Sequence, residues 1–234
     1  MSEFQWKEKI LNTNNPKTQR EFFFQKYYDA FKAIGQGKKK ILEVGCGRGT
    51  IGLYFAQDGK DVTLTDIESK AVSLARENSM KLNVETNVRK ADVLNLPFSK
   101  NSFDLVCSVG LIEHLDGGNY QRCLEECFRI LTEGGILSFI NVPAKFSIQT
   151  FFQKHDHYHR ERLTPEDYLK ACQKAGFSKV GYFYINPFPL LETEHEYFWT
   201  QVYKAVYWIR SWFMKYPMKS NKVISQAHFL FAIK

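Results

Sequence analysis

The chain has 234 residues, 44% of them hydrophobic, and a formal net charge of +7. This length suits one domain with a core of its own, and five scattered cysteines, an odd number, do not form a disulfide framework. No apolar run is long enough for a transmembrane helix and no signal peptide is visible, so we expect a cytoplasmic protein, with peripheral membrane contact left open. The net charge is compatible with an anionic substrate, a membrane surface or nucleic acid and selects none of them.

Residues 1–39 are predicted to form an N-terminal helical cover. Asn15 and Pro16 are a typical helix start, and the helix should end at Ile34, before Gly35. Its aromatic side chains are too dense for one core-facing stripe. Two interpretations stay open: the helix packs across the edge of a sheet and covers a cofactor site, or some of its aromatic residues line an acceptor pocket.

The central stretch, residues 40–66, combines a strand, a glycine turn, a helix and a second strand. A short apolar strand, 41–44, leads into Gly45, Gly47 and Gly49, and the second strand ends in Asp66. Glycines allow a tight turn and close approach of a ligand, and the helix N-terminus offers unpaired N–H groups. An acid about 20 residues after the turn is placed to accept hydrogen bonds from ribose hydroxyls. The stretch therefore predicts a nucleoside site.

The spacing of the turn distinguishes between nucleoside-binding families. Thr50 stands where a dinucleotide fingerprint requires its third glycine, and no Walker loop is present. Glu43, Gly45, Gly47 and Gly49 fill the pattern [ED]-x-G-x-G-x-G. The chain thus resembles the class I S-adenosylmethionine-dependent methyltransferases. This resemblance implies S-adenosyl-L-methionine as cofactor and an α/β fold: a Rossmann-like, doubly wound sheet of seven mostly parallel strands, the last one antiparallel, with helices on both faces.

The resemblance also implies which residues bind the cofactor. Asp66 and its neighbour Ile67 would serve the ribose end, and Asp92 with Val93, just past a third strand at 87–91, the adenine. Asp92 could instead form a turn or cap a helix. The full set of implied cofactor residues is Glu43, Gly45, Cys46, Gly47, Gly49, Asp66, Ile67, Asp92, Val93 and Ser108.

Further elements follow by their patterns. Asn119 can cap a helix, a Gly134–Gly135 turn should open a strand at 136–142, and Thr164 should begin a helix that ends at Gly176. The other expected elements are a helix at 68–81 and strands at 103–108, 177–185 and 227–233. The resemblance implies that the last strand inserts antiparallel between the fifth and sixth strands.

A catalytic base is needed only if the acceptor is a hydroxyl or a protonated amine. His114 is the first candidate because it follows the fourth strand and titrates near neutral pH, with Glu113 orienting it or contacting the acceptor. His114 could instead only order its loop. His157 and His159 are second-rank candidates. We predict no metal, because residues 155, 157 and 159 share a face only in an extended strand. Cys123 and Cys127 are interpreted as packed core thiols.

The acceptor is narrowed by exclusion. The fourth strand lacks the Asn/Asp-Pro-Pro-aromatic motif of amino-methylating DNA enzymes, and no Pro-Cys nucleophile is present, so nucleic acid is disfavoured. We predict methyl transfer to an O or N atom of a small molecule, a lipid-like or quinone-like compound or a glycan intermediate. The alternative is a non-catalytic S-adenosylmethionine-binding regulatory or partner protein.

The stretch 186–225 is predicted to form an aromatic, cationic amphipathic helix. Three roles for this helix stay open from the sequence: a lid or acceptor wall, a peripheral membrane contact, or a homodimer contact through 195–216. We expect a single methyltransferase domain over 1–234. Its parts are the helical cover 1–39, the cofactor-binding core 40–185, the insertion or lid 186–225 and the final strand 226–234.

Overall fold

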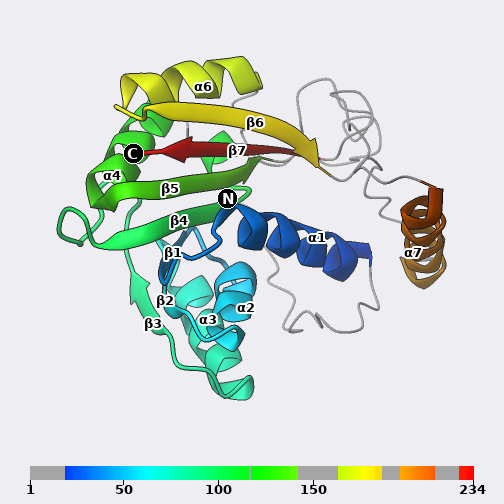
Figure 1. Cartoon of the computed structure of the whole chain (residues 1–234). Helices are drawn as coiled ribbons and strands as arrows, with labels where there is room; N and C mark the ends of the chain where they lie inside the picture. Colours follow the sequence, from blue (N-terminus) through cyan, green and yellow to red (C-terminus); the bar gives the residue numbers. More distant parts are fainter. Residues whose placement is uncertain (1–18, 116, 142–162, 186–195, 214–226) are drawn as a thin grey trace.

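The computed structural model describes residues 19–115, 117–141, 163–185, 196–213 and 227–234. These residues form one sheet with helices on both faces (Figure 1). The strands are β1 (Lys40–Val44), β2 (Asp61–Asp66), β3 (Asn87–Lys90), β4 (Phe103–Val109), β5 (Leu131–Asn141), β6 (Lys179–Ile185) and β7 (Ala227–Ile233). The helices are α1 (Gln19–Ile34), α2 (Thr50–Gln57), α3 (Ser69–Lys81), the 3₁₀ turn η1 (Ile112–His114), α4 (Asn119–Ile130), α6 (Pro165–Lys174) and α7 (Glu196–Phe213).

The seven strands lie in the order β3-β2-β1-β4-β5-β7-β6. β7 runs antiparallel to both β5 and β6, and the pairings among β1 to β5 are parallel. The predicted fold class, including the position of the last strand, is confirmed. The strand order reverses between β1 and β4, and in open α/β sheets ligands bind at such a switch point, beyond the carboxyl ends of the strands.

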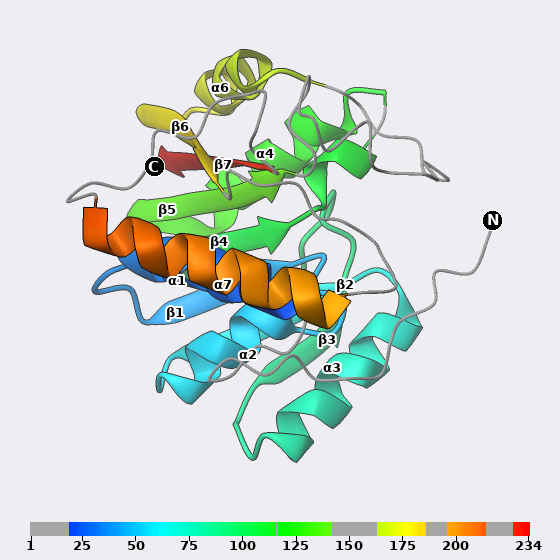
Figure 2. The same ribbon diagram turned by 90° about the vertical axis from the view of Figure 1, so that its right-hand side faces the viewer.

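One face of the sheet is covered by α1, α2 and α3, with α7 packed against α1. The aromatic side chains of α1 fill this core: the ring of Phe31 lies 5.1 Å from that of Phe229, and the ring of Phe23 lies 5.6 Å from that of Tyr203 on α7. Packing therefore accounts for the aromatic density of α1. Figures 1 and 2 show α7 across the edge at which the parallel strands end, in front of α1.

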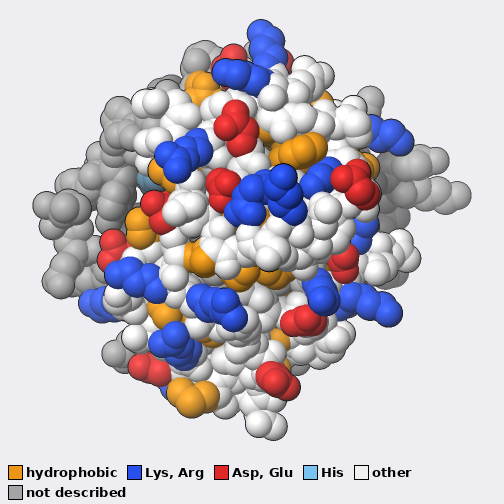
Figure 3. All heavy atoms as spheres, turned by 90° about the vertical axis from the view of Figure 1, so that its left-hand side faces the viewer, with side chains coloured by type: hydrophobic (Ala, Val, Ile, Leu, Met, Phe, Trp, Pro, Cys, Tyr) orange, Lys and Arg blue, Asp and Glu red, His pale blue; other side chains and the backbone are white. Residues whose placement is uncertain are grey.

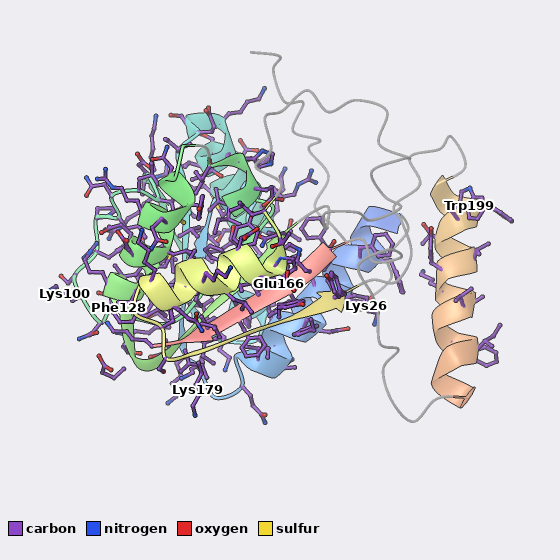
Figure 4. The ribbon with its side chains drawn as sticks, turned by 90° about the horizontal axis from the view of Figure 1, so that it is seen from above. Lys26, Lys100, Phe128, Glu166, Lys179 and Trp199 are labelled. Atoms are coloured by element: carbon purple, nitrogen blue, oxygen red, sulfur yellow. The ribbon has the colours of Figure 1, made fainter. Side chains whose placement is uncertain are left out.

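The other face is covered by α4, α6 and η1. Cys123, Cys127 and Cys172 are fully buried there, as expected for packed core thiols. Seen from above, α6 lies over β6 and β7, with Glu166 in its first turn at the carboxyl-end edge of the sheet (Figure 4). The predicted start of this helix is confirmed. The side chain of its N-cap residue, Thr164, accepts from the backbone N–H of Asp167, whose carboxylate accepts from the backbone N–H of Thr164.

Two expectations about local structure were wrong. The N-cap of α4 is Gly118, not Asn119, because the chain enters the helix in a left-handed conformation (φ 83°) that favours glycine. β5 begins at Leu131 rather than at residue 136, since Leu131 already pairs with Phe103 before the register shifts to Leu105 and Ile136. The Gly134–Gly135 turn therefore lies inside the strand as an irregularity.

No helix in the part of the chain that the structure describes is long and apolar enough to span a bilayer.

Candidate functional site

The glycine turn between β1 and α2 has a backbone that other residues would strain. Gly45, Gly47 and Gly49 all have positive φ, at 59°, 54° and 80°. A Cβ on Gly45 would lie 2.8 Å from Leu111 Cδ1, and one on Gly49 would lie 2.8 Å from Leu64 Cδ1. The turn therefore needs glycine both for its dihedral angles and for its close packing. It presents bare backbone to a ligand at the switch point.

Asp66, at the end of β2, is held beside this turn. Its carboxylate accepts the N–H of Gly47 over 2.8 Å through Oδ2 and the N–H of Glu68 over 2.9 Å through Oδ1. A carboxylate has about four lone-pair sites, so acceptor capacity remains for the two hydroxyls of a ribose. The next side chain, Ile67, is 56% exposed. It offers an apolar surface beside the carboxylate, which suits the flat face of a purine.

Glu43 lies behind the turn and holds the first turn of α2. The N-cap residue of this helix, Gly49, has no side chain to cap it, and the buried Oε2 of Glu43 accepts the N–H of Gly52 over 2.8 Å. Burial raises the pKa of Glu43 to about 8, although this hydrogen bond lowers it in part. Glu43 thus fixes the helix end that faces the ligand. Its direct contact with a cofactor stays a prediction.

Cys46 contributes to the site through its backbone. Its N–H donates to the carbonyl of Thr65 over 2.9 Å and its carbonyl accepts the N–H of Gly49 over 2.8 Å, so it fastens the turn to β2. The side chain is buried in the core, where burial raises the thiol pKa well above its usual value.

Asp92 lies just past β3 and is exposed. Its Oδ1 accepts the N–H of Leu94 over 2.9 Å, so it also forms the turn that we had considered as the alternative. Val93 is buried in the core on the α4–α6 face, and contact of its backbone with a cofactor stays a prediction. A turn that fixes the carboxylate is compatible with an adenine contact, and that role stays a prediction.

On the other side of the switch point, β4 leads into the loop that carries the candidate base. The buried Ser108 hydroxyl donates to the carbonyl of Val44 over 2.7 Å and ties the end of β4 to β1. After Gly110 the chain turns into η1, which packs against β5. Within it Glu113 is buried and His114 is exposed. The side chain of His114 is therefore accessible at the edge of the sheet, as a base that meets an acceptor must be.

Other predicted residues lie elsewhere. His157 and His159, with His155, fall outside the described residues. Among the residues that the structure describes, no group of three potential metal-binding side chains occurs.

Two residues that the sequence analysis did not select lie at the same edge. Asn141, at the end of β5, and His228, near the start of β7, are 2% and 1% exposed, and the amide nitrogen of Asn141 lies 2.8 Å from Nε2 of His228. Burial lowers the pKa of His228 to about 4. One signal in the sequence could have drawn attention to His228 alone: it is a histidine near the start of a final strand that is otherwise apolar.

The fold and this site define a nucleoside-binding α/β protein with a doubly wound sheet. Residues 41–135 match the family model described as a methyltransferase domain. Over these residues, less than half of the chain, the protein is similar to methyltransferase domains, and the cofactor that this similarity indicates is S-adenosylmethionine. The residues present fit it: a glycine turn without room for side chains, a carboxylate for the ribose and an exposed apolar side chain beside it.

Relatives and solved structures agree with this assignment. The chain is 33% identical over 153 residues to 2-methyl-6-phytyl-1,4-hydroquinone methyltransferase 1, chloroplastic, of Oryza sativa subsp. japonica, with 63% of this chain and 44% of that protein covered. It is 24% identical to a ubiquinone biosynthesis O-methyltransferase of Azoarcus sp., with 63% and 67% covered. A SAM-dependent methyltransferase from Thermotoga maritima has the same fold, with a TM-score of 0.65, 20% identity and 91% and 90% covered. The chain spans less than half the length of the rice relatives.

Proposed function

We propose that this protein transfers a methyl group from S-adenosylmethionine to an oxygen atom of an apolar, ring-shaped acceptor of the quinol type. The observation that carries the proposal is the arrangement at the switch point. The glycine turn and Asp66 offer a nucleoside site on β1 and β2, and the exposed His114 follows β4, the neighbouring strand. The names of the rice and Azoarcus relatives support the quinol class.

Bound S-adenosylmethionine supplies an electrophilic methyl group, so the protein chiefly aligns the acceptor and excludes water. In this proposal the turn at Gly45 and Gly47 and the carboxylate of Asp66 fix the cofactor. His114 accepts the proton of the reacting hydroxyl, because a neutral imidazole is a competent base near neutral pH. The buried Glu113 lies on the same 3₁₀ turn and orients this segment.

The exposed side chains of α7 support an acceptor that is lipid-like. Tyr203 is buried, whereas Phe198, Trp208 and Ile209 are 60%, 62% and 50% exposed. Large apolar side chains gathered on one exposed helix suit contact with a membrane that holds such an acceptor. We therefore propose a cytoplasmic protein that touches the membrane through α7. A homodimer through the same helix is the competing interpretation.

Nucleic acid stays outside the proposal. Figure 3 shows the end of the molecule opposite α7, where Lys and Arg side chains are interspersed with Asp and Glu. This end of the molecule therefore lacks the single positive patch or stripe that a nucleic-acid-binding surface normally has. For the rest of the molecule, the exclusion of nucleic acid rests on the missing motif at the end of β4.

The proposal is tested by incubating the full chain with S-adenosylmethionine carrying a labelled methyl group. The acceptor panel contains a prenylated hydroquinone, a prenylated phenol and a water-soluble catechol, with and without lipid vesicles. We expect labelled ether products and S-adenosylhomocysteine, with the prenylated compounds preferred. Binding of both sulfur nucleosides without any methylated product would favour the non-catalytic alternative and overturn the proposed reaction.

Contact of α7 with the membrane has a separate test. We expect the wild-type chain to sediment with vesicles, and the Phe198→Ser/Trp208→Ser variant to stay in the supernatant with its thermal stability unchanged. Equal sedimentation of both proteins, or a shift from dimer to monomer in the variant, would instead favour the homodimer.

A further inference from the structure

The Asn141–His228 pair is a buried polar pair at the edge where the acceptor must bind. The two residues are register partners on β5 and β7, and the Asn141 amide nitrogen lies 2.8 Å from His228 Nε2. Their other polar atoms, Asn141 Oδ1 and His228 Nδ1, are buried and have no hydrogen-bond partner among the described residues. Leaving such atoms unpaired costs free energy, and native proteins rarely do so without a reason.

The Asn141–His228 pair lies at the same edge of the sheet as the loop that carries His114. Asn141 directly follows Ile140, whose carbonyl accepts the N–H of Gly110 over 2.8 Å, and Gly110 begins the loop that carries the candidate base. Leu137 and Phe139 of β5 and Leu230 of β7 pack on the α4–α6 face, and strand alternation puts Asn141 and His228 on that face as well. The segment η1 packs against β5 at the same edge.

On the side of α6, His228 faces an aromatic ring and one more distant charge. The ring of Tyr168 lies 5.7 Å from the imidazole, and Glu166, two residues earlier in the first turn of α6 (Figure 4), is the carboxylate whose charge acts on it. Burial outweighs that charge and lowers the pKa of His228 to about 4, so the imidazole is neutral near pH 7. A neutral pair can receive an uncharged ligand without the cost of a buried charge.

The pair offers a ligand one donor and one acceptor. If the amide of Asn141 donates to Nε2, then Nδ1 of His228 carries the proton and Oδ1 of Asn141 is the unused acceptor. If the amide is turned over, Nε2 donates to Oδ1, Nδ1 becomes the unused acceptor and the amide N–H the donor. Both arrangements complement a hydroxyl group, which donates one hydrogen bond and accepts others.

We propose that Asn141 and His228 form a subsite that binds a second ring hydroxyl of the methyl acceptor, so that the protein prefers a dihydroxylated ring to a monohydroxylated one. This inference rests on the proposed function and names the feature of the acceptor that the site selects. β4, which leads into the loop with His114, and β5, which carries Asn141, are neighbours in the sheet. Adjacent strands lie about 4.8 Å apart, which is comparable to the separation of two oxygens on one aromatic ring. One oxygen can therefore face the loop after β4 while the other meets the pair on β5 and β7.

The test compares the wild type with the double variant Asn141→Leu/His228→Phe. Removing both partners together with side chains of similar shape avoids leaving one of them buried and unpaired, so the variant is expected to fold. The acceptors are a prenylated hydroquinone and the matching prenylated phenol, which lacks the second hydroxyl. We expect the wild type to prefer the hydroquinone at least about 10-fold in kcat/KM, since buried polar groups left unpaired reject an analogue that cannot bind them.

In the double variant we expect that preference to fall to near unity, with the affinity for S-adenosylhomocysteine unchanged. An Asn141–His228 pair that served only to fasten β7 to β5 would change thermal stability and leave the ratio of the two acceptors as it is. A preference that survives in the double variant therefore overturns the inference while the proposed function stands.

A second measurement needs no turnover. The ring nitrogens of the wild type, saturated with S-adenosylhomocysteine, are recorded by ¹H–¹⁵N NMR, and the signal absent from the double variant identifies His228. We expect the hydroquinone to shift this signal and the phenol to leave it unmoved. An unmoved signal with both probes overturns the inference. A wild type that does not bind S-adenosylhomocysteine at all overturns the proposed function, and the subsite with it.

Discussion

The buried polar side chains in the two halves of the sheet differ in their hydrogen-bond partners. On the β1–β2 side, the Asp66 carboxylate receives two backbone N–H groups and Glu43 receives one. On the β5–β7 side, Asn141 and His228 hold each other, and one polar atom of each has no partner in the described part of the chain. Backbone N–H groups thus hold Asp66 and Glu43 in place, whereas the Asn141–His228 pair leaves one buried polar atom on each residue for a ligand.

This difference matches what each half has to recognise. Backbone groups are sufficient to bind a cofactor that is common to a whole family. Glycines and main-chain N–H groups bind phosphate-like or ribose groups whatever the rest of the ligand is. An acceptor differs from one relative to the next, so our proposal assigns its recognition to single side chains such as Asn141. We expect substitutions on the β1–β2 side to affect folding and cofactor binding together, and those on the β5–β7 side to affect the acceptor.

The largest effect is expected in the glycine turn, where Gly49→Ala can be compared with Gly59→Ala. Both residues are left-handed, at φ 80° and 74°, but a Cβ on Gly49 would meet Leu64 Cδ1 at 2.8 Å, whereas one on Gly59 has nothing within 4 Å. Gly59→Ala should cost only the backbone strain, about 1–2 kcal/mol. Gly49→Ala adds overpacking and should cost about 4 kcal/mol in all. Urea unfolding measures both variants, and equal losses would mean that the turn is not tightly packed.

The second effect is a pH dependence that has opposite signs in the two halves. His228 has a pKa lowered to about 4, below its ordinary 6.5, so the folded protein binds fewer protons than the unfolded chain between these values. Its stabilising contribution, about 3 kcal/mol, is present above pH 6.5 and is lost as the pH falls towards 4. Glu43 has a pKa raised to about 8, so the folded protein there binds more protons and loses stability as the pH rises from 4.5 through 8.

Unfolding curves from pH 4 to pH 9 separate the two contributions. Asn141→Leu/His228→Phe should flatten the acid side of the stability profile alone, and Glu43→Gln the basic side alone, because glutamine still accepts the N–H of Gly52 but does not ionise. A profile that neither variant changes would show that these two groups are not buried as described.

The third effect concerns the exposed base. His114→Ala should lower kcat by about 100-fold, which is about 2.7 kcal/mol, because a positioned base commonly contributes at least that much. Affinity for S-adenosylhomocysteine, measured by calorimetry, should stay the same, since His114 lies beyond β4, whereas the glycine turn and Asp66 lie at the ends of β1 and β2. Unchanged turnover would leave His114 only the role of ordering its loop.

The smallest of these effects is expected at Asp66. Asp66→Ala should weaken the affinity for S-adenosylhomocysteine by about 2 kcal/mol, the cost of hydrogen bonds lost from a charged acceptor. Asp66→Asn keeps one acceptor oxygen and should lose less. Calorimetry at 25 °C measures the affinity of both variants for S-adenosylhomocysteine. The melting temperature of the ligand-free protein is the control, because it reports the loss of the hydrogen bonds from Gly47 and Glu68. An unaltered affinity in the alanine variant would remove Asp66 from the ribose site.

Features that depend on neighbouring residues could be predicted from the sequence. The strand–turn–helix from β1 to α2, the acid at the end of β2 and the capping box at Thr164 follow from residue types at short spacing, and the structure contains all three. The position of β7 came from the family resemblance and is confirmed. Two local expectations were wrong, at Asn119 and at the start of β5, because a left-handed glycine and a register shift change the ends of elements whose pattern is otherwise clear.

Contacts between side chains on different strands could not be predicted from the sequence and are known only from the structure. Asn141 and His228 are 87 residues apart, and no local sequence pattern predicts their hydrogen bond. The same holds for Glu43, which lies nine residues before Gly52 in the chain and caps α2 from β1, a role that spacing does not reveal. Local propensity and spacing act over a few residues, whereas strand order and register bring distant polar groups together, so the glycine turn and the acid beside it could be predicted from the sequence and the Asn141–His228 pair could not.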